Sequence, residues 1–466
     1  MAEPLWTSNE ILAATGGRLS GAGFDASGVS IDTRSLEPGD LFVALIGETD
    51  GHAYVDQALA KGAAGVLVER PASGSSIVVG STQAALESLG LAARARAIQA
   101  RCGAVTGSVG KTSVTQAVAA GLALAGASSH ASVKSYNNHI GVPLTLARMP
   151  RDTLRAVFEM GMNHPGEIEP LSRMVAPDVV AITTVGAVHV ENFPDGEAGV
   201  ARAKAEIFAG LAPGGTAILN LDDRWFDVLR REAAHAGARI LTFGSSDDAD
   251  AELLTFTQAA DGAQVTARFG GEKLAFAIRQ NGAHWGLNSL AVLLMLSELG
   301  VDRPTSLAAL AAFAPLDGRG AARAVQLPGG AFTLIDESYN ANPLSVTAAL
   351  RTLGASPAKG RRIVALTDML ELGAESENLH AGLAKEIEAA GVDLVFCAGP
   401  LMNSLWRTLS PTRRGAYAQL AAELEPQLVR AIEPGDVVMV KGSRDSKAAA
   451  LAQALLALDT QAGKVD

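Results

Sequence analysis

The chain has 466 residues, of which 48% are hydrophobic and 19% are charged, and its formal net charge at pH 7 is -11. This length exceeds what one core usually accommodates, so we expect about three domains, and the composition lacks the polar excess of disordered chains. The acidic balance argues against a protein whose main task is to bind a nucleic-acid backbone, although a phosphate pocket needs only a few cations.

The cysteines and the N-terminal residues predict a cytoplasmic protein. Cys102 and Cys397 stand in apolar, strand-like runs without metal-ligand spacing, which is typical of reduced core residues. Met1-Ala2-Glu3-Pro4-Leu5-Trp6 lacks the basic and apolar regions of a secretory signal, and no run of about 18 apolar residues occurs. We therefore expect a chain that is neither exported nor membrane-spanning.

Residues 1–99 have the pattern of a small α/β unit. We expect helices over residues 8–15, 54–61 and 82–100 and strands over residues 29–31, 41–46, 65–68 and 76–79. Polar residues gather in its loops, in Asp32-Thr33-Arg34, Pro38-Gly39-Asp40 and Asp50-Gly51-His52. An arginine beside hydroxyls suits a phosphate or a uracil edge, whereas ordinary turn chemistry is the alternative explanation.

From about residue 100 the pattern changes to a regular alternation of strands and helices. Strands expected over residues 103–106, 155–159, 178–183 and 216–220 predict a mostly parallel, doubly wound sheet for residues 100–316. Residues 251–256, 262–269 and 272–279 alternate like an antiparallel meander attached to it, and a helix over residues 288–299 closes the unit. Ligands bind such sheets beyond the carboxyl ends of the strands, which is where polar residues fall in this chain.

The first of these polar segments is Thr106-Gly107-Ser108-Val109-Gly110-Lys111-Thr112-Ser113, between an apolar strand and a helix expected over residues 112–126. A glycine loop before Lys-Thr at a helix start lets backbone N–H groups and the helix N-terminus face phosphate. The loop is shorter than G-x-x-x-x-G-K-[ST], because the first glycine of that pattern would fall at Val105. A plain Gly-Ser turn with a nearby lysine is therefore the alternative.

Three further residues at this edge could carry chemistry. Glu159 ends an apolar strand, a position that suits Mg²⁺ shared with the Thr112 hydroxyl, or else a capping or salt-bridged acid. His189 also follows a strand end and could bind a second divalent ion or a substrate oxygen, or be structural. Lys204 lies in an amphipathic helical pattern, where a lone lysine is ordinarily solvated.

After the junction Pro315-Leu316-Asp317-Gly318-Arg319-Gly320 the alternation restarts. Strands expected over residues 332–336, 361–367, 394–398 and 437–441 predict a third, Rossmann-like domain for residues 317–466. It has no G-x-G-x-x-G loop, so we expect no dinucleotide.

A set of motifs recurs in order along the chain: Thr106-Gly107-Ser108-Val109-Gly110-Lys111-Thr112, Asn137-Asn138-His139-Ile140-Gly141-Val142-Pro143, Glu159-Met160-Gly161, His189, Ala203-Lys204-Ala205-Glu206, Gly318-Arg319 and Asp336-Glu337-Ser338-Tyr339-Asn340-Ala341-Asn342-Pro343. Their order and spacing resemble the Mur ligases over nearly the whole chain. Asp32-Thr33-Arg34, Asp368-Met369-Leu370-Glu371-Leu372-Gly373 and Lys441-Gly442-Ser443-Arg444 resemble the members that add D-alanyl-D-alanine.

The resemblance implies a three-domain enzyme in which residues 1–99 hold a UDP-sugar, residues 100–316 bind ATP and residues 317–466 bind the incoming dipeptide. In this family ATP phosphorylates the terminal carboxylate of the substrate, and an amine then attacks the acyl phosphate. The implied substrates are UDP-MurNAc-tripeptide and D-Ala-D-Ala, and the implied products are the pentapeptide precursor of peptidoglycan, ADP and phosphate. We expect a monomer that uses Mg²⁺, with two ions.

The resemblance also assigns residues to roles. The ATP set is Gly107, Ser108, Val109, Gly110, Lys111, Thr112, Ser113, Asn288 at the adenine, Arg319 at the phosphates and Asp336 at the ribose. The metal set is Thr112, Glu159, His189 and Lys204, with Lys204 carbamylated so that it becomes an anion able to bind Mg²⁺. The catalytic set is Lys111, Lys204, His189 and Arg319. The substrate set is Asp32, Thr33, Arg34, His52, Asn137, Asn138, Tyr339, Asn340, Asn342, Lys441 and Arg444.

The sequence departs from the family pattern at Gly282-Ala283-His284-Trp285-Gly286-Leu287-Asn288, where the family has G-x-H-N-x-x-N. Asn288 is retained, and the adenine could stack on the indole of Trp285. The alternatives are a sister ligase that adds one amino acid, whose D-N-P-[RK] signature this chain lacks; folylpolyglutamate synthase, which lacks the N-terminal domain; and an inactive nucleotide-binding protein. The sequence leaves open whether the third residue of the substrate peptide is diaminopimelate or lysine.

Overall fold

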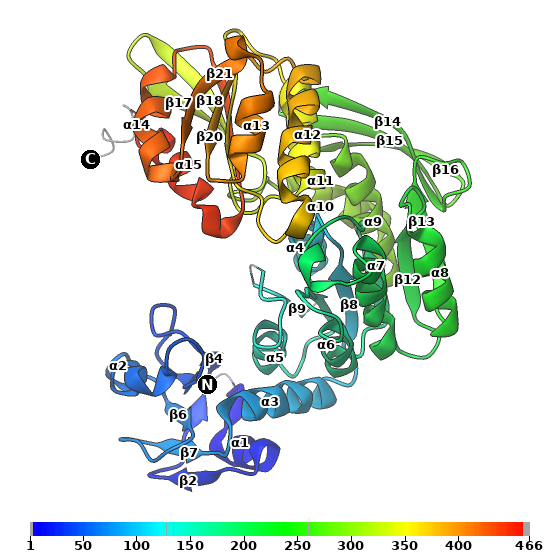
Figure 1. Ribbon diagram of the computed structural model, residues 1–466. Coiled ribbons are helices and arrows are strands. Elements are labelled where there is room, and N and C mark those ends of the chain that lie inside the picture. The colour runs from blue at the N-terminus through cyan, green and yellow to red at the C-terminus, as the bar shows by residue number, and fades with distance from the viewer. Residues whose placement is uncertain (1–2, 127, 134, 260, 460–466) are drawn as a thin grey trace.

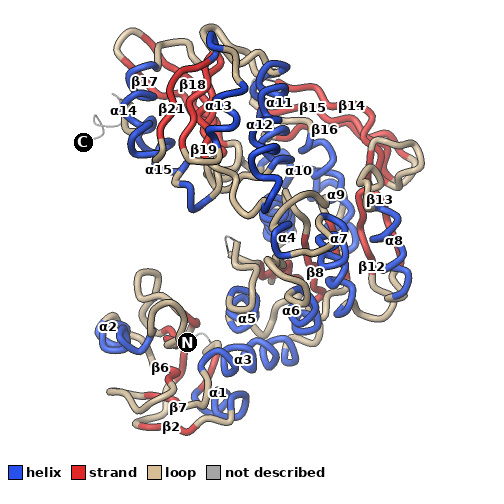
Figure 2. The backbone as a smooth tube through the Cα atoms, in the orientation of Figure 1, coloured by secondary structure: helices blue, strands red, loops and turns tan. Residues whose placement is uncertain are grey.

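The computed structural model describes residues 3–126, 128–133, 135–259 and 261–459 (Figure 1). Its strands form three large sheets and a two-stranded ribbon, and each large sheet is built from one continuous part of the chain. Helices and mostly parallel strands alternate in all three parts (Figure 2). The predicted mixed α/β class, with a doubly wound central sheet, is confirmed.

The N-terminal unit contains a five-stranded sheet in the order β2-β7-β6-β5-β4, in which the β2–β7 pair is antiparallel and the other pairs are parallel. Its strands are β2 (Arg18–Ser20), β4 (Gly28–Ser30), β5 (Asp40–Val43), β6 (Gly65–Val68) and β7 (Ser76–Val78), with the ribbon β1 (Trp6–Thr7) and β3 (Asp25–Ala26) beside them. Its helices are α1 (Ser8–Thr15), α2 (Val55–Ala60) and α3 (Thr82–Arg96).

The central unit is a nine-stranded sheet in the order β16-β15-β14-β13-β12-β11-β8-β10-β9. Its strands are β8 (Arg101–Thr106), β9 (Ser129–Ala131), β10 (Arg155–Glu159), β11 (Val179–Ile182), β12 (Thr216–Asn220), β13 (Arg239–Gly244), β14 (Ala251–Ala259), β15 (Gly262–Phe269) and β16 (Glu272–Ile278). All neighbouring strands from β9 to β14 are parallel, and β14, β15 and β16 form the predicted antiparallel meander.

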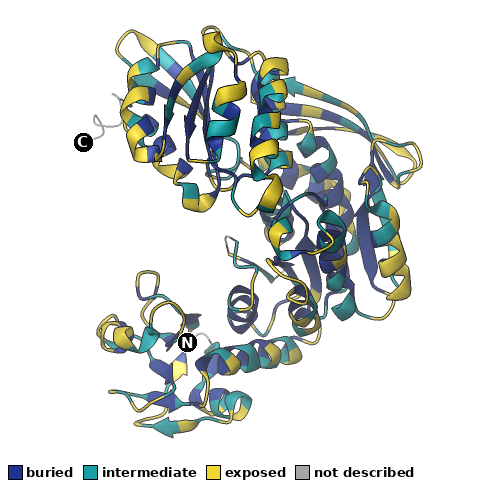
Figure 3. Ribbon diagram, in the orientation of Figure 1, coloured by how far each residue is buried: buried dark blue, intermediate teal, exposed yellow. Residues whose placement is uncertain are grey.

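Helices cover both faces of the central sheet. The core on one face contains side chains from α4 (Lys111–Leu124), α9 (His284–Glu298) and α10 (Arg303–Ala312). The core on the other face contains side chains from α5 (Gly141–Ala147), α6 (Ile168–Val175), α7 (Glu197–Ala205) and α8 (Phe226–His235). The strands are therefore buried between two helical layers (Figure 3).

The C-terminal unit contains a six-stranded sheet in the order β17-β18-β22-β19-β20-β21, parallel except for the β17–β18 hairpin. Its strands are β17 (Ala321–Leu327), β18 (Gly330–Glu337), β19 (Arg362–Thr367), β20 (Leu394–Ala398), β21 (Arg414–Ala418) and β22 (Val437–Lys441). Its helices are α11 (Pro343–Ala355), α12 (Ser376–Ala389), α13 (Met402–Thr408), α14 (Ala421–Ala431) and α15 (Ala448–Leu456).

The N-terminal and C-terminal units both attach to the central unit but lie on different parts of it (Figure 1). On the N-terminal side, α5 shares one hydrophobic core with α1 and α3, and Trp6 Nε1 donates a hydrogen bond to Ala147 O at 2.8 Å. On the C-terminal side, the carboxyl ends of β8 and β10 face loops that follow β18, β19 and β22 across a shared cavity. The second contact is the one that positions the site.

Several expected boundaries shift in the structure. The strand expected over residues 41–46 ends at Val43, because the Leu45 N–H turns back to Val43 O. The helix expected over residues 82–100 ends at Arg96, and the helix expected over residues 288–299 begins earlier, at His284. In the described part of the chain, no helix is both long enough and apolar enough to cross a membrane.

Candidate active site

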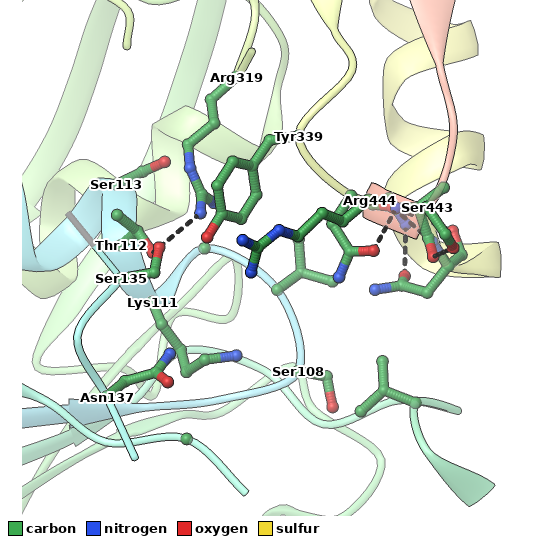
Figure 4. A pocket seen from close by; sticks show the side chains of 18 of the residues that line it. Ser108, Lys111, Thr112, Ser113, Ser135, Asn137, Arg319, Tyr339, Ser443 and Arg444 are labelled. Atoms are coloured by element: carbon green, nitrogen blue, oxygen red, sulfur yellow. Dashed lines mark hydrogen bonds between the residues drawn. The ribbon is translucent and has the colours of Figure 1, made fainter. Parts of the chain in front are cut away.

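A cavity of about 430 Å³ lies where the carboxyl ends of the central and C-terminal sheets face each other. Such strand ends are the usual ligand sites of α/β sheets, and here two sheets contribute to one site. The predicted residues that line the cavity are Ser108, Val109, Gly110, Lys111, Thr112, Ser113, Asn137, Asn138, Glu159, His189, Asn288, Arg319, Tyr339, Asn340, Asn342, Lys441 and Arg444. Figure 4 shows several of them pointing toward one another from both units.

The loop between β8 and α4 has the conformation of a phosphate cradle. Gly107 and Gly110 adopt φ angles of 148° and 87°, which favour glycine, and a Cβ on Gly107 would lie 2.0 Å from Thr183 Oγ1. Helix α4 begins directly after Gly110, and no side chain caps its first N–H groups. These free donors and the helix dipole face the cavity, which is the arrangement that binds an anion.

Lys111 and the neighbouring strand end hold this loop in shape. Lys111 Nζ donates to Gly107 O at 2.7 Å, and the Ser108 N–H donates to Thr184 O at 2.7 Å. Burial lowers the pKa of Lys111, and the charge of Glu159 acts in the opposite direction. The lysine is thus pre-positioned in the loop beside a carboxylate.

Glu159 is the clearest indication of a cation site. The residue is only 1% exposed, and its Oε1 accepts a hydrogen bond from Asn137 Nδ2 at 2.6 Å. Its Oε2 is buried and has no hydrogen-bond partner among the described residues. A buried carboxylate oxygen without a donor is costly, so a divalent cation bound there would stabilise it.

Thr112 and Glu159 are suitable ligands for Mg²⁺, which prefers oxygen. The described residues contain no group of three or more His, Cys, Asp or Glu side chains placed to hold a metal ion. Mg²⁺ is commonly bound by one or two protein oxygens together with substrate phosphates and water, so a small donor set fits a nucleotide-bound ion better than a protein cage.

His189 lies at the boundary between the two units. Its Nδ1 is in ion-pair contact with Glu371 Oε2 of the C-terminal unit, without the alignment of a hydrogen bond. Burial lowers the pKa of His189, while the negative charge of Glu371 acts against this effect. Both residues adopt left-handed backbone conformations, with φ of 52° and 63°, which are strained for residues other than glycine.

Lys204 is buried, contrary to the ordinary interpretation of its helix as a solvated face. It is 2% exposed and lies near the end of α7, outside the cavity lining. Burial, and to a lesser degree the positive charge of Lys111, hold its pKa well below the usual lysine value. A buried amine that is readily deprotonated is the form that can react with CO₂ to give a carbamate, because only the neutral amine is nucleophilic.

Arg319 reaches the phosphate loop from the junction between the central and C-terminal units. Its guanidinium stacks on the Tyr339 ring at 3.9 Å and donates to Ser135 Oγ at 3.1 Å. Ser135 Oγ lies 3.0 Å from Thr112 Oγ1 (Figure 4). Tyr339, expected as a substrate contact, therefore also serves as the platform for Arg319.

The residues expected at the adenosine are only partly brought together. Asn288 lies beside Gly110, since a Cβ built on that glycine would be 3.3 Å from the Asn288 amide. Asp336 is outside the cavity lining, and its Oδ1 accepts hydrogen bonds from the Ser338 N–H and hydroxyl. Trp285 is 5% exposed and packs against Phe313, and it also lines the cavity next to Asn288, so stacking of adenine on its indole stays a prediction.

The residues expected to contact the dipeptide differ in whether their side chains already have partners within the protein. Lys441 is buried, forms an ion pair with Glu337 at 3.2 Å and donates to Asn340 O at 3.0 Å. Asn342 caps α11, with its side chain accepting from the Ser345 N–H. Arg444 is exposed, and no ion pair or side-chain hydrogen bond within the described ranges engages its guanidinium. Arg444 is thus the free cation at this end of the cavity.

The four N-terminal substrate candidates lie outside this cavity. Asp32 and Arg34 form an exposed ion pair with each other, and the Thr33 hydroxyl donates to Gln57. The side chain of His52 is only 4% exposed: Nε2 accepts from the Glu69 N–H at 2.9 Å, so Nδ1 must carry the proton that it shares with Asp50. Both ring nitrogens are therefore used within the fold, which favours a structural role for His52.

Three residues near the site were not identified by the sequence reasoning. Ser135 bridges Arg319 and Thr112, Glu371 contacts His189, and the buried carboxylate of Asp223 holds the Thr184–Val185 backbone and hydroxyl groups. Asp223 follows the end of β12, so the rule about strand ends could have indicated it. Glu371 lies in the motif Asp368-Met369-Leu370-Glu371-Leu372-Gly373, but no local pattern indicates which distant residues Glu371 and Ser135 contact.

Comparisons with known proteins agree along the whole chain. Residues 25–101 match the family described as "Mur ligase family, catalytic domain", residues 105–296 match "Mur ligase middle domain", and residues 323–444 match "Mur ligase, glutamate ligase domain". The chain is 34% identical over 453 residues to the UDP-N-acetylmuramoyl-tripeptide--D-alanyl-D-alanine ligase of Escherichia coli (strain K12), covering 96% of this chain and 98% of that protein.

Two further matches support the same relationship. The protein of that name from Bacillus subtilis (strain 168) is 32% identical, covering 90% of this chain and 91% of the relative. A crystal structure of MurF from Acinetobacter baumannii superposes with a TM-score of 0.84 at 28% identity, covering 97% of this chain and 99% of that one. Three domain matches in the same order, and relatives covered over nearly their full length, lead to one conclusion: this chain belongs to the Mur ligase family.

Proposed function

We propose that this protein is the ATP-dependent ligase that joins D-alanyl-D-alanine to UDP-N-acetylmuramoyl-tripeptide, with an acyl phosphate as the intermediate. The observation that carries the proposal is the match, over 96% of the chain, to a ligase with that printed name. The geometry supports it, because a phosphate cradle, an orphaned carboxylate oxygen and a free arginine line one cavity.

In the first half of the proposed reaction, the substrate carboxylate attacks the γ-phosphorus of ATP, an O–P bond forms and ADP leaves. Lys111, the amides of residues 107–112 and Arg319 are placed to hold the phosphates and to balance the charge that shifts toward ADP. Asn137 and Asn138 line the same cavity and would orient the sugar-peptide substrate. Asn288 would contact the adenine and Asp336 the ribose.

Thr112 and Glu159 would hold Mg²⁺, with His189 and a carbamylated Lys204 at a second ion. When bound, Mg²⁺ neutralises phosphate charge and so favours both nucleotide binding and transfer. Carbamylation would replace the buried positive charge of Lys204 by a negative one, which removes its repulsion from Lys111. Glu159 would contribute its buried Oε2 and Thr112 its hydroxyl oxygen.

In the second half, the amine of D-Ala-D-Ala attacks the acyl carbon, a C–N bond forms and phosphate leaves with the C–O electron pair. We assign dipeptide binding to residues 317–466, UDP-sugar binding to residues 1–99 and ATP binding to residues 100–316. Arg444 is the best placed receptor for the dipeptide carboxylate, since Lys441 is already paired with Glu337. Asn340, Asn342 and Tyr339 line the same end of the cavity.

We also propose that the enzyme acts in the cytoplasm as a monomer. Both cysteines are free and buried, which suits a reducing compartment. Residues of two units of one chain line the cavity, in keeping with a monomer.

A coupled phosphate-release assay tests the proposal. We expect phosphate, and the pentapeptide product by mass spectrometry, only when ATP, Mg²⁺, UDP-MurNAc-tripeptide and D-Ala-D-Ala are all present. Equal phosphate release without the dipeptide would contradict the ligase assignment. Side-by-side assays with diaminopimelate- and lysine-containing tripeptides identify the third peptide residue.

A matched pair of variants controls the assay. Lys111→Met removes the loop cation and should abolish turnover, whereas Lys385→Met changes a lysine on the surface of α12 and should leave it unchanged. Loss of activity in both variants would indicate a general effect of removing a lysine.

A further inference from the structure

The hydroxyl of Ser135 joins two parts of the cavity and has no role in the account so far. Ser135 lies in the segment between β9 and α5 and lines the cavity. The Arg319 guanidinium donates to its Oγ at 3.1 Å, and Thr112 Oγ1 lies 3.0 Å from the same oxygen. Figure 4 shows Arg319 approaching the Ser135 and Thr112 side chains from the opposite unit.

Counting donors and acceptors constrains what this hydroxyl does. A serine hydroxyl has one proton and two lone pairs, whereas a guanidinium can only donate, so Arg319 occupies one lone pair of Ser135. For Thr112 Oγ1 to direct a lone pair toward a cation, its hydroxyl proton must point away from that cation, toward another acceptor. Either hydroxyl can be the donor of the 3.0 Å contact between Thr112 and Ser135; with Thr112 as the donor, Ser135 Oγ accepts through its second lone pair.

In that arrangement both lone pairs of Ser135 are in use, and its proton remains available. Ser135 lines the cavity next to the phosphate loop, where the free N–H groups of α4 also point. An anionic oxygen in the cavity is the natural acceptor for this proton, and a hydrogen bond to a charged acceptor is stronger than one between neutral groups.

Contacts with the Tyr339 segment fix the position of the Arg319 guanidinium. Its guanidinium rests on the Tyr339 ring at 3.9 Å, and the Tyr339 N–H donates to Gly318 O at 3.1 Å, next to Arg319 in the chain. The aromatic platform therefore comes from the C-terminal unit and the hydroxyl acceptor from the central unit. Ser135 receives the guanidinium only while the two units lie together as they do here.

We propose that Ser135 is a nucleotide-binding and positioning residue: its oxygen accepts the protons of Thr112 and Arg319, and its own proton is donated to a phosphate oxygen of the bound nucleotide. Through Thr112 it orients the lone pair that faces Mg²⁺, and through Arg319 it fixes the cation supplied by the domain junction. The inference rests on the proposed function only in taking Mg²⁺ and a nucleoside triphosphate as the ligands.

Isothermal titration of the full-length protein with a non-hydrolysable ATP analogue, with Mg²⁺ and with EDTA, tests this proposal. We expect S135A to weaken binding in Mg²⁺ by about tenfold or more, because a hydrogen bond to a charged group is lost, and to weaken it less in EDTA. S135T keeps the hydroxyl and should recover most of the affinity. V133A, at an exposed position in the same segment, is the matched control and should bind like the wild type.

Affinity of S135A equal to that of V133A would overturn the proposal, and so would S135T binding as weakly as S135A. Thermal unfolding checks that each variant is folded. If S135A does not fold, S135C takes its place, because a thiol is a poor donor and acceptor. Nucleotide binding is measured without the peptide substrates, so a negative ligase assay and a negative titration are distinguishable results.

Discussion

Asp223 tests how hydrogen bonds from the neighbouring segment, residues 184–185, hold the phosphate loop in place. Its buried carboxylate accepts hydrogen bonds from the Val185 N–H at 2.6 Å and the Thr184 hydroxyl at 3.0 Å, and from the Trp225 N–H at 2.9 Å. The Thr184 backbone in turn accepts from the Ser108 N–H of the loop. Asp223 thus acts on the phosphate loop through one intermediate segment.

Replacing Asp223 by alanine would leave the Val185 N–H without its acceptor. A buried donor without a partner costs about 1–3 kcal/mol, and loss of the two further hydrogen bonds brings the expected decrease in unfolding free energy to about 2–4 kcal/mol. For a unit of this size, where 1 kcal/mol shifts the unfolding midpoint by about 2–4 °C, that corresponds to a midpoint lower by roughly 4–16 °C. The affinity for ADP should fall several-fold, because the loop loses a fixed support.

Calorimetric unfolding and ADP titration of D223A, D223N and D222A measure these effects. Asp222 is the neighbouring residue, is exposed and accepts from the Ser245 N–H, so D222A is the matched control. Asparagine retains an acceptor oxygen, and D223N should lose less stability than D223A. An unfolding midpoint and an ADP affinity of D223A that equal those of D222A would refute the argument.

Three further outcomes are expected. G107A should lose nucleotide binding, because a Cβ there meets a threonine oxygen at 2.0 Å, whereas G126A, also at positive φ but with open space around it, should retain binding in the same titration. K204A should lose turnover and regain part of it when short-chain carboxylic acids are added; activity like that of the wild type would exclude Lys204 from the site. His380 Nε2 accepts from the Met369 N–H, and burial lowers its pKa below the ordinary 6.5, so its contribution to stability is present above pH 6.5 and is lost as the pH falls below it. H380Q should reduce the decline in unfolding midpoint between about pH 8 and about pH 5, and an unchanged decline would show that other groups cause it.

The sequence predicts the central sheet well because its strands are buried on both faces and read as apolar runs. Strands β10 and β12 have the expected bounds, and the phosphate loop lies where the glycine and lysine pattern placed it. The edge strands β9 and β17 were missed, because β9 has three residues and β17 exposes several of its side chains. The internal strand β13 was missed as well, and only two of its six residues are buried.

The site is less predictable because partners come from distant segments. Lys204 looked solvated, yet its neighbours Val200, Ala201, Ala203 and Ala205 on α7 are all buried in the core, and Lys204 is buried with them. His52 looked available, yet Asp50 and the Glu69 N–H occupy its ring. Whether a side chain is buried or paired depends on the tertiary fold. Residue type and position at a strand end therefore predict where a site lies, but they predict less reliably which of its side chains are free.

The charges of the cavity explain why nucleotide and metal ion should bind together. Within the described ranges, the hydrogen-bond acceptors of Lys111 and Arg319 are neutral oxygens of Gly107 and Ser135, and Glu159 offsets part of the charge of Lys111. Glu159 Oε2, in the same cavity, lacks a donor. A polyphosphate bound alone would pair with Lys111 and Arg319 but would be repelled by the Glu159 carboxylate. A divalent cation bound alone would pair with Glu159 but would be repelled by Lys111. Bound together, each ligand screens the repulsion that the other would meet, so the affinity of either is raised by the presence of the other.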